Sequence, residues 1–162
     1  MTEDAHRGDR NCADNCCTIS REIDSIWCSR KCARFAKEMG FCENDIWELC
    51  IATSELVTNV LKYAGTGKLS FSATDSQVPE LEIVVEDDGP GISDIPQAVT
   101  DGISEGIDVS ERPDPRTRRG LGAGLGAVHR LMDSVDIQNR HPRGTKVVVI
   151  KRCDHAPSGE NG

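Results

Sequence analysis

The sequence of 162 residues has little positive charge and no long apolar segment. Its 19 Lys and Arg residues face 27 Asp and Glu residues, for a net charge of −8. Because binding to a phosphate backbone needs a basic surface, this balance argues against nucleic acid as a partner. No apolar run approaches the roughly 20 residues that cross a bilayer, and residues 1–6 lack the apolar region of a signal peptide. The sequence therefore predicts a cytoplasmic protein that contacts no membrane.

The common cysteine patterns are also missing, although eight cysteines are present. A chain with 37% hydrophobic residues and no export signal does not require disulfides. Cys12, Cys16 and Cys17 follow a Cys-x₃-Cys-Cys spacing, which differs from the usual Cys-x₂-Cys pair of zinc sites. We expect this N-terminal group to be dispensable for activity, and metal binding or redox sensing through it is the alternative.

The length suits one domain with a single core. Residues 1–15 and 154–162 are polar and are predicted to be disordered tails, which leaves 16–153 as the domain. A polar, irregular stretch covers residues 92–120. A loop of this length in a compact domain is usually functional or disordered, and we interpret it as a lid.

Periodic apolar residues predict the order strand, two helices, two strands, loop, helix, two strands. The predicted strands are 17–23, 68–74, 81–86, 135–139 and 146–151, and the predicted helices are 24–40, one from 43 to beyond 60, a short one at 95–99, and 124–132. This order predicts an α+β fold, a two-layer α/β sandwich with helices on one face of a mostly antiparallel sheet.

Two of the predicted helices carry apolar stripes that include Cys28, Cys32 and Cys50, which we expect to be small core residues. Glu55 and Asn59 fall together on the side of the second helix opposite its stripe, one turn apart. Such a pair most often forms a solvated helix face. Their spacing also lets the two side chains act jointly.

A glycine box, Gly122-Ala123-Gly124-Leu125, precedes the helix at 124–132. Glycine allows backbone N–H groups to approach phosphates, and a helix N-terminus attracts anions. The dinucleotide fingerprint is rejected because residues 113–119 stand where a strand is required, and the Gly-Lys-Ser/Thr ending of a P-loop is absent. By itself the box fits a lid hinge equally well. Arg118 or Arg119 in the lid could reach a phosphate, but a charged loop without a ligand fits them too.

Asp87 ends a predicted strand before the turn Gly89-Pro-Gly91. Its carboxylate can accept the exocyclic amine of adenine, whereas guanine presents an oxygen there, a mismatch of about 1–3 kcal/mol that favours ATP over GTP. The same residues also make a good turn without any ligand. Thr145 follows Gly144 in a second turn, where its hydroxyl could bond adenine or the Asp87 carboxylate.

Together, and in this order, four patches resemble the nucleotide pocket of the GHKL ATPase superfamily, which includes gyrase, MutL and the histidine kinases. The patches are Glu55-Leu-Val-Thr-Asn59, Asp87-Asp-Gly89-Pro-Gly91, Gly120-Leu-Gly122-Ala-Gly124-Leu125 and Gly144-Thr145. From about residue 17 to 152 the chain resembles the small bacterial serine kinases of anti-sigma and stressosome pathways, and most of all the stressosome switch kinases.

The resemblance implies the Bergerat fold and a protein serine/threonine kinase that uses ATP and Mg²⁺. It implies that Glu55 is the general base, that Asn59 is the Mg²⁺ ligand, and that Asp87 binds adenine. It also implies STAS-domain scaffold or antagonist proteins as substrates, and a PP2C-type phosphatase as the downstream target.

Two other functions stay open at this point. One is an anti-sigma factor of the same fold that binds a sigma factor directly, and the other is a binding module in which nucleotide only sets the lid conformation. A binding module should not need Glu55 as a base. A histidine kinase is disfavoured, because no phosphoacceptor histidine helix precedes the four patches.

Overall fold

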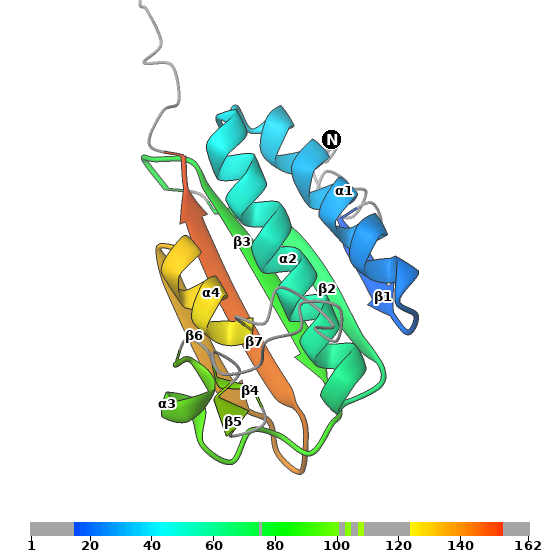
Figure 1. The fold of residues 1–162 in the computed structure, drawn as a ribbon. Coiled ribbons are helices and arrows are strands. Elements are labelled where there is room, and N and C mark those ends of the chain that lie inside the picture. Colours follow the sequence, from blue (N-terminus) through cyan, green and yellow to red (C-terminus); the bar gives the residue numbers. More distant parts are fainter. Residues whose placement is uncertain (1–14, 75, 101–102, 105–106, 109–123, 154–162) are drawn as a thin grey trace, which may run out of the picture.

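The computed structural model describes residues 15–74, 76–100, 103–104, 107–108 and 124–153 (Figure 1). The elements in chain order are β1 (Cys16–Ile19), α1 (Ile23–Glu38), α2 (Glu43–Tyr63), β2 (Gly67–Thr74), β3 (Glu80–Asp87), α3 (Ile95–Ala98), β4 (Ile103–Ser104), β5 (Ile107–Asp108), α4 (Gly124–Leu131), β6 (Ser134–Asn139) and β7 (Thr145–Arg152). The predicted order is confirmed, with the small β4–β5 pair added inside the predicted loop. Apart from Asn15, the predicted tails lie outside the described residues, as does most of the predicted lid. The Asn15 carbonyl oxygen accepts a hydrogen bond from the Phe71 N–H at 2.9 Å, so residue 15 is part of the fold and not of a tail.

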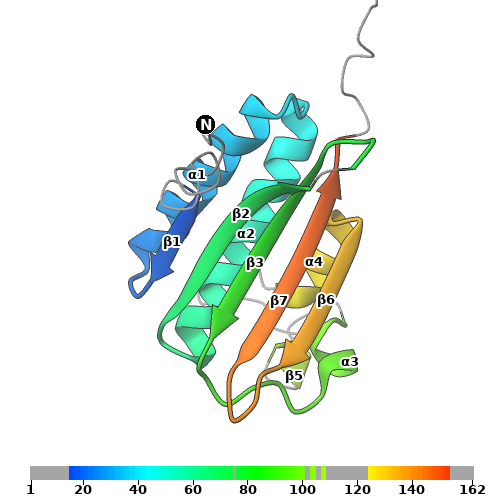
Figure 2. The ribbon, with the colours of Figure 1, turned by 180° about the vertical axis from the view of Figure 1, so that it is seen from behind.

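Five strands form one antiparallel sheet in the order β1-β2-β3-β7-β6. Helices α1, α2 and α4 lie on one face of this sheet (Figure 1), and the opposite view shows the other face without helices (Figure 2). The predicted two-layer α+β architecture is therefore confirmed. No helix in the described part of the chain is long and apolar enough to span a membrane.

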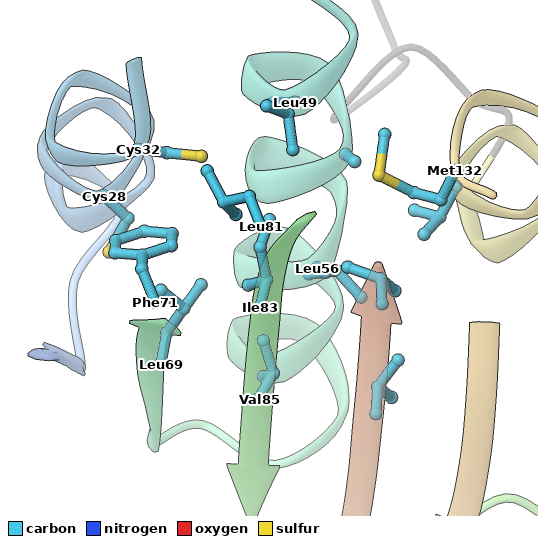
Figure 3. Close-up of a cluster of buried hydrophobic side chains, with 14 of the residues drawn as sticks. Cys28, Cys32, Leu49, Leu56, Leu69, Phe71, Leu81, Ile83, Val85 and Met132 are labelled. Atoms are coloured by element: carbon cyan, nitrogen blue, oxygen red, sulfur yellow. The ribbon is translucent and has the colours of Figure 1, made fainter. Parts of the chain in front are cut away.

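The core lies between the sheet and α2 (Figure 3). Side chains alternate between the two faces of a strand, so every second residue of the central strands points at the helices. The buried strand residues on this face include Leu69, Phe71, Leu81, Ile83, Val85 and Val149. Full burial of one such side chain contributes about 1.5–3 kcal/mol, which makes this layer the main source of stability.

The first strand is shorter than predicted, because the chain turns at Ser20. The Asp24 carboxylate accepts hydrogen bonds from the backbone N–H groups of Ser20 (2.9 Å) and Arg21 (2.8 Å), which lower the pKa of Asp24. The helix predicted from residue 24 therefore begins one residue earlier, at Ile23. Its predicted end is confirmed, since Gly40 follows with a φ of +89°.

Candidate functional site

A cavity of about 420 Å³ lies among α2, the end of β3, the loop into α3, the start of α4 and β7. This volume falls in the range of small-molecule pockets, roughly 300–1,000 Å³. Six residues predicted for the site line it: Asn59, Asp87, Gly91, Gly124, Leu125 and Thr145. The fold thus brings parts of all four sequence patches to one place. Gly122 and Ala123 lie outside the described residues, as do Arg118 and Arg119.

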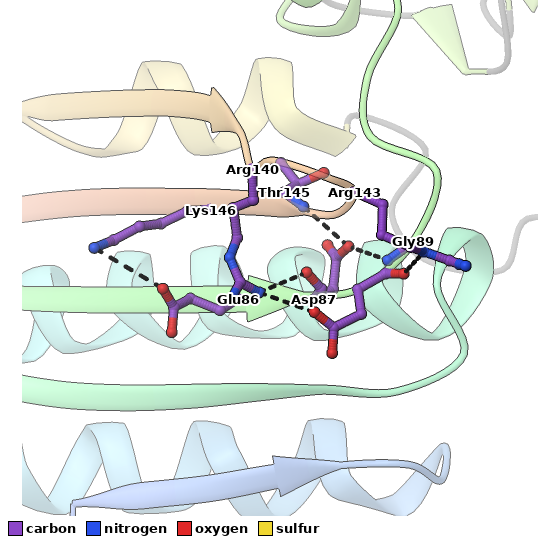
Figure 4. A network of polar contacts seen from close by, with 8 residues as sticks. Glu86, Asp87, Gly89, Arg140, Arg143, Thr145 and Lys146 are labelled. Atoms are coloured by element: carbon purple, nitrogen blue, oxygen red, sulfur yellow. Dashed lines mark hydrogen bonds and ion pairs between the residues drawn. The ribbon is translucent and has the colours of Figure 1, made fainter.

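Asp87 is the last residue of β3, and its carboxylate is held from two sides (Figure 4). Its Oδ1 accepts hydrogen bonds from the backbone N–H of Gly89 at 2.8 Å and from that of Thr145 at 3.2 Å. Both of these bonds fall on Oδ1, and Oδ2 has no hydrogen-bond or ion-pair partner among the described residues. The geometry thus fixes the plane of the carboxylate and leaves one oxygen available to a ligand.

The sequence predicted a contact of the Thr145 hydroxyl with either adenine or Asp87. The contact with Asp87 is made instead by the Thr145 backbone N–H. Thr145 is buried and is the first residue of β7. Because β7 pairs with β3, its N–H lies next to the end of β3. Gly89 does not line the cavity, but its N–H completes the support of Asp87.

The turn between β6 and β7 closes tightly over the end of β3. Gly144 has a φ of +105°, and a Cβ at this position would lie 2.1 Å from the Asp87 carbonyl oxygen. Arg140 Nη1 donates to the Asp87 carbonyl oxygen at 3.0 Å and to Asp88 Oδ1 at 3.1 Å (Figure 4). Arg143 Nε donates to the Asp88 carbonyl oxygen at 2.6 Å. The turn therefore holds the backbone of Asp87 in place.

Asn139, the last residue of β6, supports the other rim of the cavity. Its Oδ1 accepts from the Ile92 N–H and its Nδ2 donates to the Ile92 carbonyl oxygen, both at 2.8 Å. Gly91, directly before Ile92, has a φ of +81°, and a Cβ there would lie 2.9 Å from Asn139 Oδ1. Glycine is therefore needed at position 91 for both conformation and space.

Asn59 lines the cavity from α2 and is half-buried. Glu55, one turn earlier, is only 5% exposed and is not among the described residues that line the cavity. The sequence placed both on the helix side opposite the apolar stripe, where a solvated face is the usual outcome, but at Glu55 this side is buried. The buried face of α2 is broader than its apolar stripe, because α1 and α4 flank it above the sheet (Figure 1).

A partly buried ion pair shows which element packs against this side of α2. Glu48 lies two turns before Glu55 on the same side, and its Oε2 accepts from Lys151 Nζ at 2.5 Å. The same Lys151 Nζ donates to the carbonyl oxygen of Leu131, the last residue of α4. The side of α2 that carries Glu48, Glu55 and Asn59 therefore faces α4.

Gly124 and Leu125, at the beginning of α4, form the opposite wall of the cavity. Backbone N–H groups in the first turn of a helix have no partner within the helix and attract anions. Tyr63, one turn after Asn59 on α2, adds an aromatic ring, and Lys62 Nζ lies 5.0 Å from the centre of this ring.

Reasoning from the sequence missed Tyr63, Asn139, Arg140 and Arg143. Only Tyr63 had a usable signal, its position one turn after Asn59. The other three are polar residues at a hairpin, where polar residues are expected for any function.

The described geometry agrees with comparisons with known proteins. The histidine kinase-like ATPase domain family matches residues 28–151, and the chain belongs to this family. The chain is 36% identical over 138 residues to the serine/threonine-protein kinase RsbT of Bacillus subtilis (strain 168). This match covers 85% of the chain and 95% of RsbT. It is 27% identical over 124 residues to an anti-sigma F factor of Clostridium novyi (strain NT), covering 74% and 80% of the two chains.

Among solved structures, that of full-length ShkA in complex with AMPPNP matches with a TM-score of 0.50 and 16% identity. The match covers 79% of this chain and 30% of the ShkA chain. At this identity the likeness supports the fold alone. The membership of the GHKL-type ATPase superfamily that the sequence predicted is confirmed by the family match.

Proposed function

We propose that this protein is an ATP-dependent serine/threonine kinase that acts as a partner-switching regulator in a bacterial stress or sigma-factor pathway. The observation that carries the proposal is the 36% identity to the serine/threonine-protein kinase RsbT over 85% of the chain. The cavity supports it, since separate groups of its residues suit the adenine and the phosphates of ATP.

The adenine is assigned to Asp87. The two backbone N–H groups on Oδ1 orient the carboxylate, and Oδ2 can accept the exocyclic amine of the base. Gly91 leaves space at the rim, where a Cβ would approach Asn139. A guanine would set its oxygen against Oδ2, so the site should select ATP.

The phosphates are assigned to the α4 end of the cavity, where Gly124 and Leu125 lie. Asn59 lines the same cavity from α2, and its amide oxygen is a ligand type suited to Mg²⁺. Bound Mg²⁺ supplies positive charge that offsets the charge on the phosphate oxygens. The Gly122 and Ala123 backbone belongs to the same proposed phosphate site.

Glu55 is the proposed general base. It lies one turn before Asn59 on the side of α2 that faces α4, so the two side chains can serve the same reaction. In this role its carboxylate accepts the proton of a serine or threonine hydroxyl on the partner protein.

The proposed substrates are STAS-domain proteins, and the proposed downstream target of the released kinase is a PP2C-type phosphatase. The main alternative is direct binding of a sigma factor, and the 27% identity to an anti-sigma F factor favours it among the other readings. The cytoplasmic location expected from the sequence stays a prediction.

Transfer of ³²P from ATP to a co-purified partner tests the proposal with Glu55→Gln. We expect phosphotransfer to fall by about 10²–10⁴-fold while ATP affinity stays the same, since a positioned base contributes that much. Glu43→Gln, the same change at the exposed start of α2, is the matched control and should keep full activity. Full phosphotransfer by Glu55→Gln would exclude Glu55 as the general base. A wild-type protein that binds ATP but transfers no phosphate would indicate a binding module.

A further inference from the structure

Four thiols gather where β1, α1 and α2 meet, away from the cavity. They belong to Cys17, Cys28, Cys32 and Cys50. Figure 3 shows Cys28 and Cys32 directed from α1 toward the core. No disulfide joins the cysteines of the described residues.

Like Cys50, Cys17 is only half-buried, in contrast to Cys28 and Cys32. It lies on the same face of β1 as the buried Ile19. Cys17 packs against the core cluster that contains Cys28, which is 1% exposed, and the two side chains lie within hydrogen-bonding reach of each other. The geometry thus places an accessible thiol against a buried one on a neighbouring element.

The surroundings favour the thiolate form of Cys17. The hydrogen bond from Cys28, together with Lys31, lowers the pKa of Cys17 to about 7, although burial and Asp24 act in the opposite direction. Lys31 is held beside β1, since its Nζ donates to the Cys16 carbonyl oxygen at 3.1 Å. The same hydrogen bond is the largest cause of a raised pKa at Cys28.

We propose that Cys17 and Cys28 are a redox pair that forms a reversible intramolecular disulfide when a hydroperoxide oxidises the protein. Cys17 is the thiol attacked first, and Cys28 is the resolving thiol. The other two thiols of the group are less suited. Burial raises the pKa of Cys32 to about 12 and also raises that of Cys50.

The chemistry balances with hydrogen peroxide as the oxidant. The Cys17 thiolate attacks one peroxide oxygen, the O–O bond breaks, and the departing hydroxide takes a proton and leaves as water, with Cys17 converted to a sulfenic acid. The Cys28 sulfur then attacks the Cys17 sulfur, the S–O bond breaks, and a second water carries away the Cys28 proton. Two electrons pass from the two sulfurs to the peroxide.

The first step prepares the second. Once Cys17 is a neutral sulfenic acid, Cys28 no longer donates to a thiolate, and the largest cause of its raised pKa is gone. β1 has only four residues and pairs with β2 alone, so it can move toward α1 at little cost. The disulfide would tie this edge strand to the helix.

Peptide mapping of the full-length protein by mass spectrometry, without reduction, tests the pair after treatment with hydrogen peroxide. We expect one cross-linked peptide that contains Cys17 and Cys28 and that disappears on reduction. In Cys17→Ser the yield of any cross-link to Cys28 should fall by roughly tenfold or more. Cys28→Ala should stop at a sulfenic acid on Cys17, which dimedone captures. Cys50→Ser is the matched control and should behave as the wild type does.

Mapping of the wild type decides the proposal even if a variant fails to fold. A disulfide from Cys17 to Cys12, to Cys16 or to a second chain would overturn it. So would sulfinic acid at Cys17 without a cross-link, or no oxidation of Cys17 at all.

Discussion

Asn139 holds the backbone of Ile92 with both ends of its side-chain amide, as acceptor for the N–H and donor to the carbonyl oxygen, each at 2.8 Å. This clamp joins the end of β6 to the loop that follows β3. Because the cavity wall continues from Gly91 to Asp94, the clamp sets the position of one rim of the site.

Asn139→Ala should therefore lower ATP affinity although Asn139 is not among the residues that line the cavity. Two lost hydrogen bonds cost about 1–3 kcal/mol, so we expect roughly tenfold weaker binding by calorimetry. The neighbouring exposed residue gives the control, since Gln138→Ala removes only a bond to Asp136. Equal affinity of both variants would show that the loop holds its position without the clamp.

Asp87→Asn should abolish the preference for adenine. The asparagine Oδ1 can keep the two backbone bonds now made by Asp87 Oδ1, which puts the amide N–H₂ where Oδ2 stands. The amide N–H₂ then faces the exocyclic amine of adenine, so two donors oppose each other. The ratio of ATP to GTP affinity should fall by about 10- to 100-fold. Competition between ATP and GTP measures this, with Asp88→Asn as control. A wild type that binds both nucleotides equally would contradict the assignment.

Asn59→Ala should remove most of the dependence of ATP binding on Mg²⁺. The side chain lies at the cavity and is only half-buried, so the domain should stay folded. Titrations with ATP, with and without Mg²⁺, should differ for the wild type and nearly coincide for the variant. Asn44→Ala, at the exposed start of α2, is the control. A variant that keeps its full response to Mg²⁺ would exclude Asn59 as the metal ligand.

Gly144→Ala should destabilise the fold more than Gly65→Ala. Both glycines have positive φ, +105° and +82°, which costs a non-glycine residue about 1–2 kcal/mol. Only at Gly144 would the new Cβ also clash with the Asp87 carbonyl oxygen, whereas nothing lies within 4 Å at Gly65. Urea unfolding should show an additional loss of about 1–3 kcal/mol for Gly144→Ala. Equal losses would mean that the turn can move away from β3.

Alkylation of Cys17 by iodoacetamide should respond to pH with a midpoint near 7. Because the folded pKa of Cys17 is lowered to about 7, its thiolate persists down to that pH and is protonated below it. Cys28→Ala removes the largest cause of the lowering and should move the midpoint upward, although Lys31 still lowers it and Asp24 still opposes Lys31. Quantification by peptide mapping at each pH separates Cys17 from the other thiols. A midpoint that does not move in Cys28→Ala would contradict the contact.

The fold was predictable from the sequence wherever buried residues recur at the regular spacing of one strand or one helix. The alternation around Leu69 and Phe71 and the stripe through Cys28 and Cys32 both gave elements that the structure confirms. Glu55 shows the limit of this method. Its burial arises because α4 packs on a side of α2 that carries polar residues, and the period of one helix does not report its neighbours.

The site was predictable only in part for a similar reason. Asp87 could be placed at a strand end, and a contact with Thr145 was one of two alternatives, but the group that makes the contact depends on the register between β3 and β7. Asn139 and Arg140 gain their partners only when the β6–β7 hairpin folds against the end of β3. Before that contact exists, they resemble any polar residues near a turn.

The pairing of β3 with β7 also fixes when the site can exist during synthesis. These strands are direct neighbours in the sheet, yet α3, the loop, α4 and β6 are made between them. A growing chain that has completed β3 displays Asp87 without the Thr145 N–H and without the walls that α4 and β7 provide. Contacts between such distant segments form late, because the intervening chain must first lose its freedom. Nucleotide therefore cannot assist the early steps of folding, and it stabilises only a chain whose last strand has docked.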